Sequence, residues 1–161
     1  MFILQVGEVL ISESHQLILR NESDIEIFDG VFIANDTASM MLEDGSLEVA
    51  GGSLIFGGSS RLEGINSSEL EASLGTIRIE DNASMTLQSS ASEMTGGNLV
   101  IAGEAFLFAE AVADFDPFLP WVDDGDVAFS QLEVTQGGFE ILDNALVSLT
   151  NATEITVRGT F

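Results

Sequence analysis

The chain has 161 residues and a hydrophobic content of 45%, which is enough for one domain with a continuous core. It carries 27 acidic and 4 basic side chains, and the formal net charge of -23 excludes nucleic acids and anionic membranes as electrostatically attracted partners. The absence of cysteine excludes disulfides, thiolate zinc sites and thiol catalysis. Its apolar runs are shorter than the roughly 20 residues of a membrane helix, so we expect no membrane insertion.

Apolar residues recur along the chain in pairs that are one residue apart. Two apolar residues at positions i and i+2 place both side chains on one face of a strand. The residues between the pairs are Gly, Ser, Asn, Asp and Glu, which suit tight corners rather than helices. We therefore expect short strands at the pairs Leu17/Leu19, Ile25/Ile27, Met40/Leu42, Leu47/Val49, Leu54/Phe56, Ile77/Ile79, Met85/Leu87, Leu99/Ile101 and Phe106/Phe108.

A longer repeat includes these pairs. The segment 38–42, Ala-Ser-Met-Met-Leu, matches the segment 83–87, Ala-Ser-Met-Thr-Leu, at a shift of 45 residues. The same shift superimposes Asp36 on Asp81, Gly51 on Gly96, Leu54 on Leu99 and Leu62 on Leu107. A third copy follows, in which the segment 143–145, Asp-Asn-Ala, matches the segment 81–83, and its larger shift indicates an insertion between the second and third copies.

The two periods together predict the fold. Three strands with their corners take about 22 or 23 residues, so the 45-residue repeat corresponds to two turns of a three-sided coil. We predict an all-β parallel β-helix (β-solenoid) that forms a single domain over residues 1–161, with six or seven coils stacked about 4.8 Å apart around one apolar core. An antiparallel sandwich or barrel would tolerate the strand spacing, but it does not account for the 45-residue repeat.

The repeat is interrupted over residues 110–129, which we interpret as an inserted loop or flap. This segment contains both prolines and the only tryptophan, and its apolar residues include Phe118, Leu119 and Trp121. These side chains would pack on one side of the coil if the segment is a simple lid. In a binding flap they would instead contact a partner or a glycan.

The same segment is rich in aspartate. Calcium takes about six to eight oxygen ligands, so we consider a calcium site formed by Asp114, Asp116, Asp123, Asp124 and Asp126. The spacing is not that of an EF-hand loop. The alternative is that these carboxylates are solvated at the rim of the lid and that the protein has no cofactor.

The sequence shows no catalytic residues, and we expect that the protein is not an enzyme. The single histidine, His15, lies beside Glu13 near the N-terminus, and the pattern places no serine next to it, so a Ser-His-Asp set cannot be argued. A pair such as Asp123 and Asp124 would suit a carbohydrate-active β-helix enzyme. A carbohydrate-active enzyme is less favoured than a structural protein or an adhesin.

Five of the seven asparagines fit the N-x-[ST] pattern of N-glycosylation, where roughly one match is expected by chance. The candidate acceptors are Asn21, Asn35, Asn66, Asn82 and Asn151. Glycosylation would place the protein outside the cell or on its surface. Solenoid corners also favour Asn together with Ser or Thr, which is a purely structural explanation of the same pattern.

Three corner motifs resemble those of secreted right-handed parallel β-helix surface proteins: Gly52-Ser53-Leu54, Gly97-Asn98-Leu99 and Phe32-Ile33-Ala34-Asn35. Over most of its length the chain is similar in character to adhesins and autotransporter passengers, and to subunits of archaeal sheaths and surface filaments. The resemblance implies a β-solenoid fold and an extracellular or cell-surface location.

The repeat continues close to both ends of the sequence, from Phe2/Leu4 to Ile155/Val157, without an obvious helical cap. Uncovered ends of a solenoid offer strand edges that pair readily with other strands. We therefore expect a self-assembling structural protein of a surface fibre, sheath or coat, whose partners are further copies of itself and whose assembly depends on cations, salt or glycans. The alternative is an adhesin that binds a glycan or a surface partner through the Trp121 flap.

Overall fold

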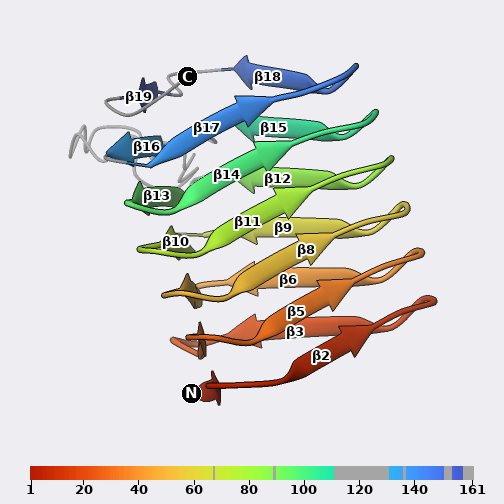
Figure 1. Cartoon of the computed structure of the whole chain (residues 1–161), viewed down its shortest axis with the longest axis vertical. Helices are drawn as coiled ribbons and strands as arrows, with labels where there is room; N and C mark the ends of the chain where they lie inside the picture. The colour runs from red at the N-terminus through yellow and green to blue at the C-terminus, as the bar shows by residue number, and fades with distance from the viewer. Residues whose placement is uncertain (67, 89, 111–130, 136, 151–153, 158–161) are drawn as a thin grey trace, which may run out of the picture.

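The computed structural model describes residues 1–66, 68–88, 90–110, 131–135, 137–150 and 154–157. Within these ranges the chain forms nineteen short strands and no helix, coiled into the three-sided stack seen from the side in Figure 1. Consecutive strands lie on different sides of the stack, and every third strand returns to the same side. The predicted all-β parallel solenoid, with coils of about 23 residues, is confirmed.

Three parallel sheets form the sides of the coil. Sheet A contains β1 (Phe2–Leu4), β4 (Asp24–Ile27), β7 (Ser46–Val49), β10 (Glu69–Ala72), β13 (Ala91–Thr95), β16 (Gln131–Thr135) and β19 (Glu154–Val157). Sheet B contains β2 (Glu8–Ile11), β5 (Val31–Ala34), β8 (Ser53–Phe56), β11 (Thr76–Ile79), β14 (Asn98–Ile101) and β17 (Gly138–Ile141). Sheet C contains β3 (Gln16–Arg20), β6 (Ser39–Glu43), β9 (Arg61–Ile65), β12 (Ser84–Gln88), β15 (Phe106–Glu110) and β18 (Leu146–Thr150).

The pairing register explains the long repeat. The offset between paired strands is 23 residues from β3 to β6, where Arg20 pairs with Glu43, and 22 residues from β4 to β7, where Asp24 pairs with Ser46. The two offsets alternate from turn to turn as far as β15 and together make the 45-residue repeat, which is therefore two turns long. For the pairs β13–β16, β14–β17 and β15–β18 the offset widens to 40 residues, as between Gly103 and Asp143, because this turn contains the insertion. It returns to 23 residues from β16 to β19, where Gln131 pairs with Glu154.

Sheets B and C have six described strands each and sheet A has seven, so the chain makes about five full turns between the first and the last strand of sheets B and C. The six or seven coils expected from the chain length correspond to these six or seven strands per sheet. The insertion adds no coil, because β13 pairs directly with β16. In Figure 1 sheet B lies in front of sheet C, and the chain rises while it runs to the right in front and to the left behind. The coil is therefore right-handed, which is the usual hand of parallel crossovers.

Alternation within each strand sends every second side chain into the coil. The inward side chains form one continuous apolar core from the first turn to the last described ones. Its largest fully buried members are Phe32, Phe56, Ile27, Met40, Leu42, Leu47, Leu54, Leu62, Leu70, Ile77, Ile79 and Met85. Each of them stabilises the stack by roughly 1.5 to 3 kcal/mol, so the core accounts for most of the favourable free energy of folding.

The corner between sheets B and C has the same construction in every second coil. Asp36, Asp81 and Asp143 have positive φ angles of 59° to 60°, and each carboxylate accepts a hydrogen bond from the backbone N–H of the corner residue one coil below. The N–H of Gly58 donates to Asp81 at 3.1 Å, and the N–H of Gly103 donates to Asp143 at 3.2 Å. A Cβ at Gly58 would lie 2.8 Å from the backbone nitrogen of Asp36, so glycine is required between the aspartates.

A column of small inward side chains follows this corner, immediately before the strands of sheet C. The backbone carbonyl of each member except the last accepts a hydrogen bond from the N–H of the residue that follows the next member, one coil above. From the first to the last they are Ala38, Ser60, Ala83, Ala105 and Ala145. Ser60 is fully buried, and its hydroxyl has no hydrogen-bond partner among the described residues.

We predict that Ser60→Ala stabilises the protein by about 1 kcal/mol, because an unsatisfied buried hydroxyl costs about that much. In a chain of this size the melting temperature should rise by about 2 to 4 °C. Thermal unfolding followed by far-UV circular dichroism measures the change. Ser39→Ala, half-buried on the outer face of β6, is the matched control, and an equal gain in both variants would contradict the explanation.

Candidate functional site

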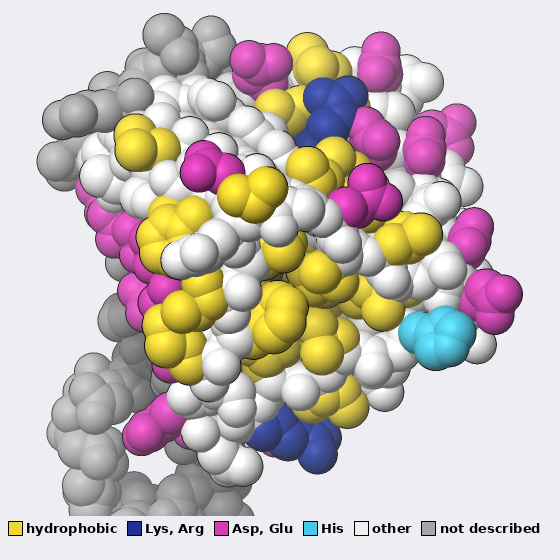
Figure 2. Space-filling view, turned by 60° about the horizontal axis from the view of Figure 1, so that its bottom comes forward, with side chains coloured by type: hydrophobic (Ala, Val, Ile, Leu, Met, Phe, Trp, Pro, Cys, Tyr) yellow, Lys and Arg dark blue, Asp and Glu magenta, His cyan; other side chains and the backbone are white. Residues whose placement is uncertain are grey.

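The N-terminal end of the coil exposes apolar side chains of a kind that later turns bury. Phe2 is 47% exposed, whereas Ile25, its partner on the next turn, is 4% exposed. A hollow of about 420 Å³ opens here into the core, and its lining includes Val9, Ile11 and Leu17. Figure 2 looks at this end, and hydrophobic side chains fill its centre. The core is thus accessible from the N-terminal end.

The first and the last described strand of each sheet have one described neighbour each. Among the described strands, β1, β2 and β3 pair only with the strands above them, and β17, β18 and β19 pair only with the strands below them. Apolar side chains are exposed at the C-terminal end as well, where Ile141 is 41% and Leu146 58% exposed. Uncovered edges of this kind are templates for pairing with another chain.

A ladder of glutamates runs up the outer face of sheet A. Its members are direct partners on neighbouring parallel strands, which lie about 4.8 Å apart. In order they are Glu26, Glu48, Glu71, Glu93 and Glu133. Acidic side chains are visible along this side of the coil in Figure 2. We call these five residues the glutamate ladder.

Burial raises the pKa of Glu71, in the middle of the ladder, above its ordinary value of 4.5, and the neighbouring charges of Glu48, Glu93 and Glu69 raise it further. A hydroxyl group partly stabilises the negative charge of a neighbouring ladder residue, since the Thr95 hydroxyl donates a hydrogen bond to the Glu93 carboxylate at 2.6 Å. The described arginines lie on the other two sheets. The ladder therefore concentrates negative charge on one side of the coil.

The sequence contains a signal for the ladder that the analysis of apolar pairs did not use. Each glutamate stands between the two apolar residues of a sheet A pair, as in Ile25-Glu26-Ile27 and Leu47-Glu48-Val49. Because the pairs stack in register, the residues between them must stack as well. The coil period would therefore have predicted the ladder.

The structure places four of the five candidate glycosylation sites on exposed corners: Asn21, Asn35, Asn66 and Asn82. Asn151 lies outside the described residues. Two of these asparagines also have a structural role, because Asn21 and Asn66 adopt φ angles of 54°, a left-handed conformation that asparagine tolerates well. Exposure is compatible with glycan attachment, while the backbone conformation alone accounts for asparagine at these two positions.

The hydroxyl residue of one sequon faces inward. Ser68, two residues after Asn66, is buried, and its hydroxyl donates a hydrogen bond to the Ser90 hydroxyl at 2.9 Å. The serine of this sequon is therefore part of a buried corner between sheets C and A. Both asparagine and serine have structural explanations here, so this sequon by itself is no argument for a glycan.

The remaining predicted site residues fall mostly within the insertion. The calcium candidates Asp114, Asp116, Asp123, Asp124 and Asp126 and the flap residues Phe118, Leu119 and Trp121 all lie outside the described residues. In the part of the chain that is described, no group of three or more His, Cys, Asp or Glu side chains could hold a metal ion. None of the described elements is a helix long and apolar enough to cross a membrane.

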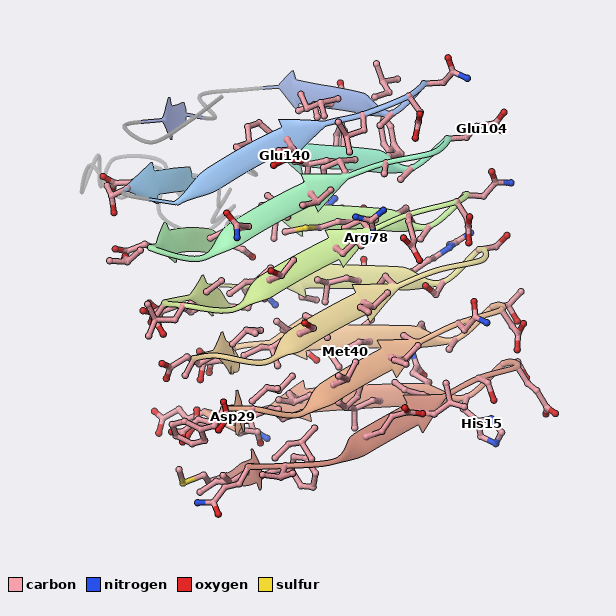
Figure 3. The ribbon with its side chains drawn as sticks, viewed as in Figure 1. His15, Asp29, Met40, Arg78, Glu104 and Glu140 are labelled. Atoms are coloured by element: carbon pink, nitrogen blue, oxygen red, sulfur yellow. The ribbon has the colours of Figure 1, made fainter. Side chains whose placement is uncertain are left out.

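His15 lies on the corner between sheets B and C at the first turn, as labelled in Figure 3. Its side chain is exposed, and its Nδ1 forms a hydrogen bond of 2.7 Å with the backbone carbonyl of Ser12. This hydrogen bond holds the ring against the backbone of its own corner, which is a local structural role.

Comparisons with models of protein families, with curated proteins and with solved structures find no match.

We predict that Glu71→Gln stabilises the protein at neutral pH by about 0.5 kcal/mol, because like charges on adjacent strands repel. A raised pKa in the folded state means that stability is lost as the pH rises from about 4.5, the ordinary value, through the raised pKa. The gain should therefore be present at neutral pH and disappear below the ordinary pKa.

Urea unfolding of both proteins across this pH range measures the effect. Glu104→Gln is the matched control, since Glu104 is an exposed corner residue away from sheet A, labelled in Figure 3. A gain from Glu71→Gln that stays constant down to low pH would show that charge repulsion in the ladder is not its cause.

Proposed function

We propose that this protein is an extracellular structural subunit that assembles end to end with further copies of itself. The observation that carries the proposal is the open first turn, where the core is accessible through a hollow of about 420 Å³ beside three sheet edges. A second copy offers three sheet edges of the same kind around the same type of apolar core. A contact between two different ends of one subunit does not close on itself, so it propagates into a fibre.

Hydrophobic burial is the driving force that this proposal requires. Exposed apolar side chains gather at the two ends of the coil, with Phe2, Ile3 and Leu10 at one end and Ile141 and Leu146 at the other. Each square ångström of apolar surface removed from water contributes about 25 cal/mol. Backbone hydrogen bonds between the facing edges would add directionality and fix the strand direction.

The net charge of -23 opposes the association of two copies. Salt shortens the range of this repulsion, with a Debye length of about 30 Å at 0.01 M and about 10 Å at 0.1 M. We therefore predict that raising the concentration of sodium chloride increases assembly, measured by static light scattering on the full chain. Assembly that is independent of salt and of divalent cations would contradict the role given to charge.

The extracellular part of the proposal is supported by the exposed sequons at Asn21, Asn35 and Asn82. Electron microscopy of protein isolated from its natural source, combined with intact-mass measurement of the same sample, tests both parts. Ordered filaments, tubes or sheets whose subunits carry glycan mass are the expected result. Unmodified monomers would overturn the proposal.

We predict that Phe2→Glu weakens assembly by at least about 30-fold, because an unpaired charge buried in an interface costs about 2 kcal/mol or more. Phe2 lies at the open end and is already half exposed, so the coil itself should fold normally. The matched control is Leu74→Glu, which introduces the same charge at an apolar residue that is 75% exposed but lies midway along the stack.

Light scattering and negative-stain microscopy measure assembly, and circular dichroism verifies the fold of both variants. Equal loss of assembly in the two variants would mean that added charge, rather than its position at the end, is responsible.

A further inference from the structure

We infer that Asn82 carries an N-linked glycan whose first sugar packs on the ring of Phe106. Asn82 lies on the corner between sheets B and C, and Phe106 lies on β15, which has described strands both below and above it. The inference rests on the glycosylated, extracellular subunit proposed above. It adds which sequon is occupied and which side chain the sugar contacts.

Among the four described sequon asparagines, Asn82 alone lacks a structural explanation. Asn21 and Asn66 adopt left-handed φ angles of 54°. The Asn35 side chain lies against the backbone of the next coil, where a Cβ at Gly58 would be 3.0 Å from its Oδ1 atom. Asn82 is exposed, its φ angle is not left-handed, and its side chain forms no hydrogen bond with a described residue.

The hydroxyl residue of the Asn82 sequon is also at the surface. Ser84 faces outward on β12 and is half-buried, whereas Ser68 of the Asn66 sequon is buried. Glycan attachment forms a bond between the Asn82 amide nitrogen and the anomeric carbon of the first sugar. The nitrogen loses one proton, and the sugar donor, a glycosyl phosphate on a lipid carrier, loses its phosphate-linked carrier.

Phe106 lies directly above this sequon. It pairs with Ser84 in the register of sheet C, and its N–H donates a hydrogen bond of 3.1 Å to the carbonyl of Ala83, the residue after Asn82. Asn82 therefore lies one coil below Phe106 and two residues to the side. Their Cα atoms are at most about 9 Å apart, so a sugar on the Asn82 amide can reach the ring.

The surroundings of Phe106 suit a neutral sugar. Its ring lies beside that of Phe108, with centroids 6.1 Å apart and planes inclined by 17°, and both side chains are half-buried on the outer face of β15. The outward neighbours on the adjacent strands carry no charge: Ser84, Thr86, Leu146 and Ser148. The C–H groups of a sugar ring are attracted to the negative face of an aromatic ring. A neutral first sugar therefore matches this surface.

The internal repeat provides a comparison within the same chain. At the equivalent positions 45 residues earlier, Thr37 stands in the place of Asn82 and Arg61 in the place of Phe106. The acceptor asparagine and the aromatic ring thus occur together in one copy and are both replaced in the other. This is the pattern expected of two residues that serve one contact.

Glycopeptide mass spectrometry of the protein from its natural source measures which asparagines are modified. We expect a glycan at Asn82. The same measurement shows whether any other sequon carries a glycan, so it separates this inference from the proposed extracellular location.

Proton NMR of the glycosylated full chain tests the packing. Protons of a sugar that lies over an aromatic ring are shifted upfield by the ring current, and in Phe106→Ala these resonances should return to the positions of a free glycan. Phe106→Leu keeps an apolar side chain on β15 and should lose the upfield shift as well. Circular dichroism verifies that both variants fold.

Thermal unfolding gives a second readout. Phe106→Ala should lower the melting temperature by about 2 to 4 °C more in the glycosylated protein than in the Asn82→Gln background, because the sugar contact is lost only in the former. Asn35→Gln removes another sequon on the same corner and is the matched control. In that background the effect of Phe106→Ala should be as large as in the glycosylated protein.

Each outcome has a separate meaning. A source protein without a glycan at any sequon would overturn the extracellular part of the proposed function, and the Asn82 contact with it. Glycans at other sequons together with an unmodified Asn82 would overturn this inference alone. A glycan at Asn82 whose resonances and contribution to the melting temperature are unchanged in Phe106→Ala would also overturn it.

Discussion

The in-register pairing of each turn with the turn below is the constraint on which the rest of the structure depends. Pairing offsets that alternate between 23 residues and 22 residues place the inward side chains of successive turns above one another, and most of these side chains are apolar. The corners must then adopt the same conformation in coil after coil, which is why residues with positive φ recur there and why glycine alternates with aspartate at Gly58, Asp81 and Gly103. The residue types at the corners are therefore set by the stacking of the coils.

The same register also stacks charges that repel one another. The glutamate ladder on sheet A is a direct consequence. When the two apolar neighbours of a glutamate stack on those of the next turn, the glutamate must lie above the glutamate of that turn. Burial and the repulsion of the neighbouring carboxylates together raise the pKa of Glu71. The fold tolerates this cost because the apolar core is continuous along the stack.

Much of the fold could be predicted from the sequence, because apolar pairs and a 45-residue repeat follow directly from three-sided coiling. The expected six or seven coils correspond to the six or seven described strands of each sheet, because the insertion lengthens one corner without adding a turn. The handedness required the structure. The glutamate ladder was missed because Glu26 or Glu71, taken alone, looks like any solvated residue, and only the register brings them together. The calcium and flap hypotheses concern residues outside the described ranges and stay predictions.

The alternation of aspartate and glycine in the corner between sheets B and C has a consequence for how such a chain can change its length. A single added turn would break this alternation above Asp36, where a Cβ in the place of Gly58 would lie 2.8 Å from the backbone nitrogen of Asp36. Gain or loss of material is therefore easiest in units of two turns, which is six strands.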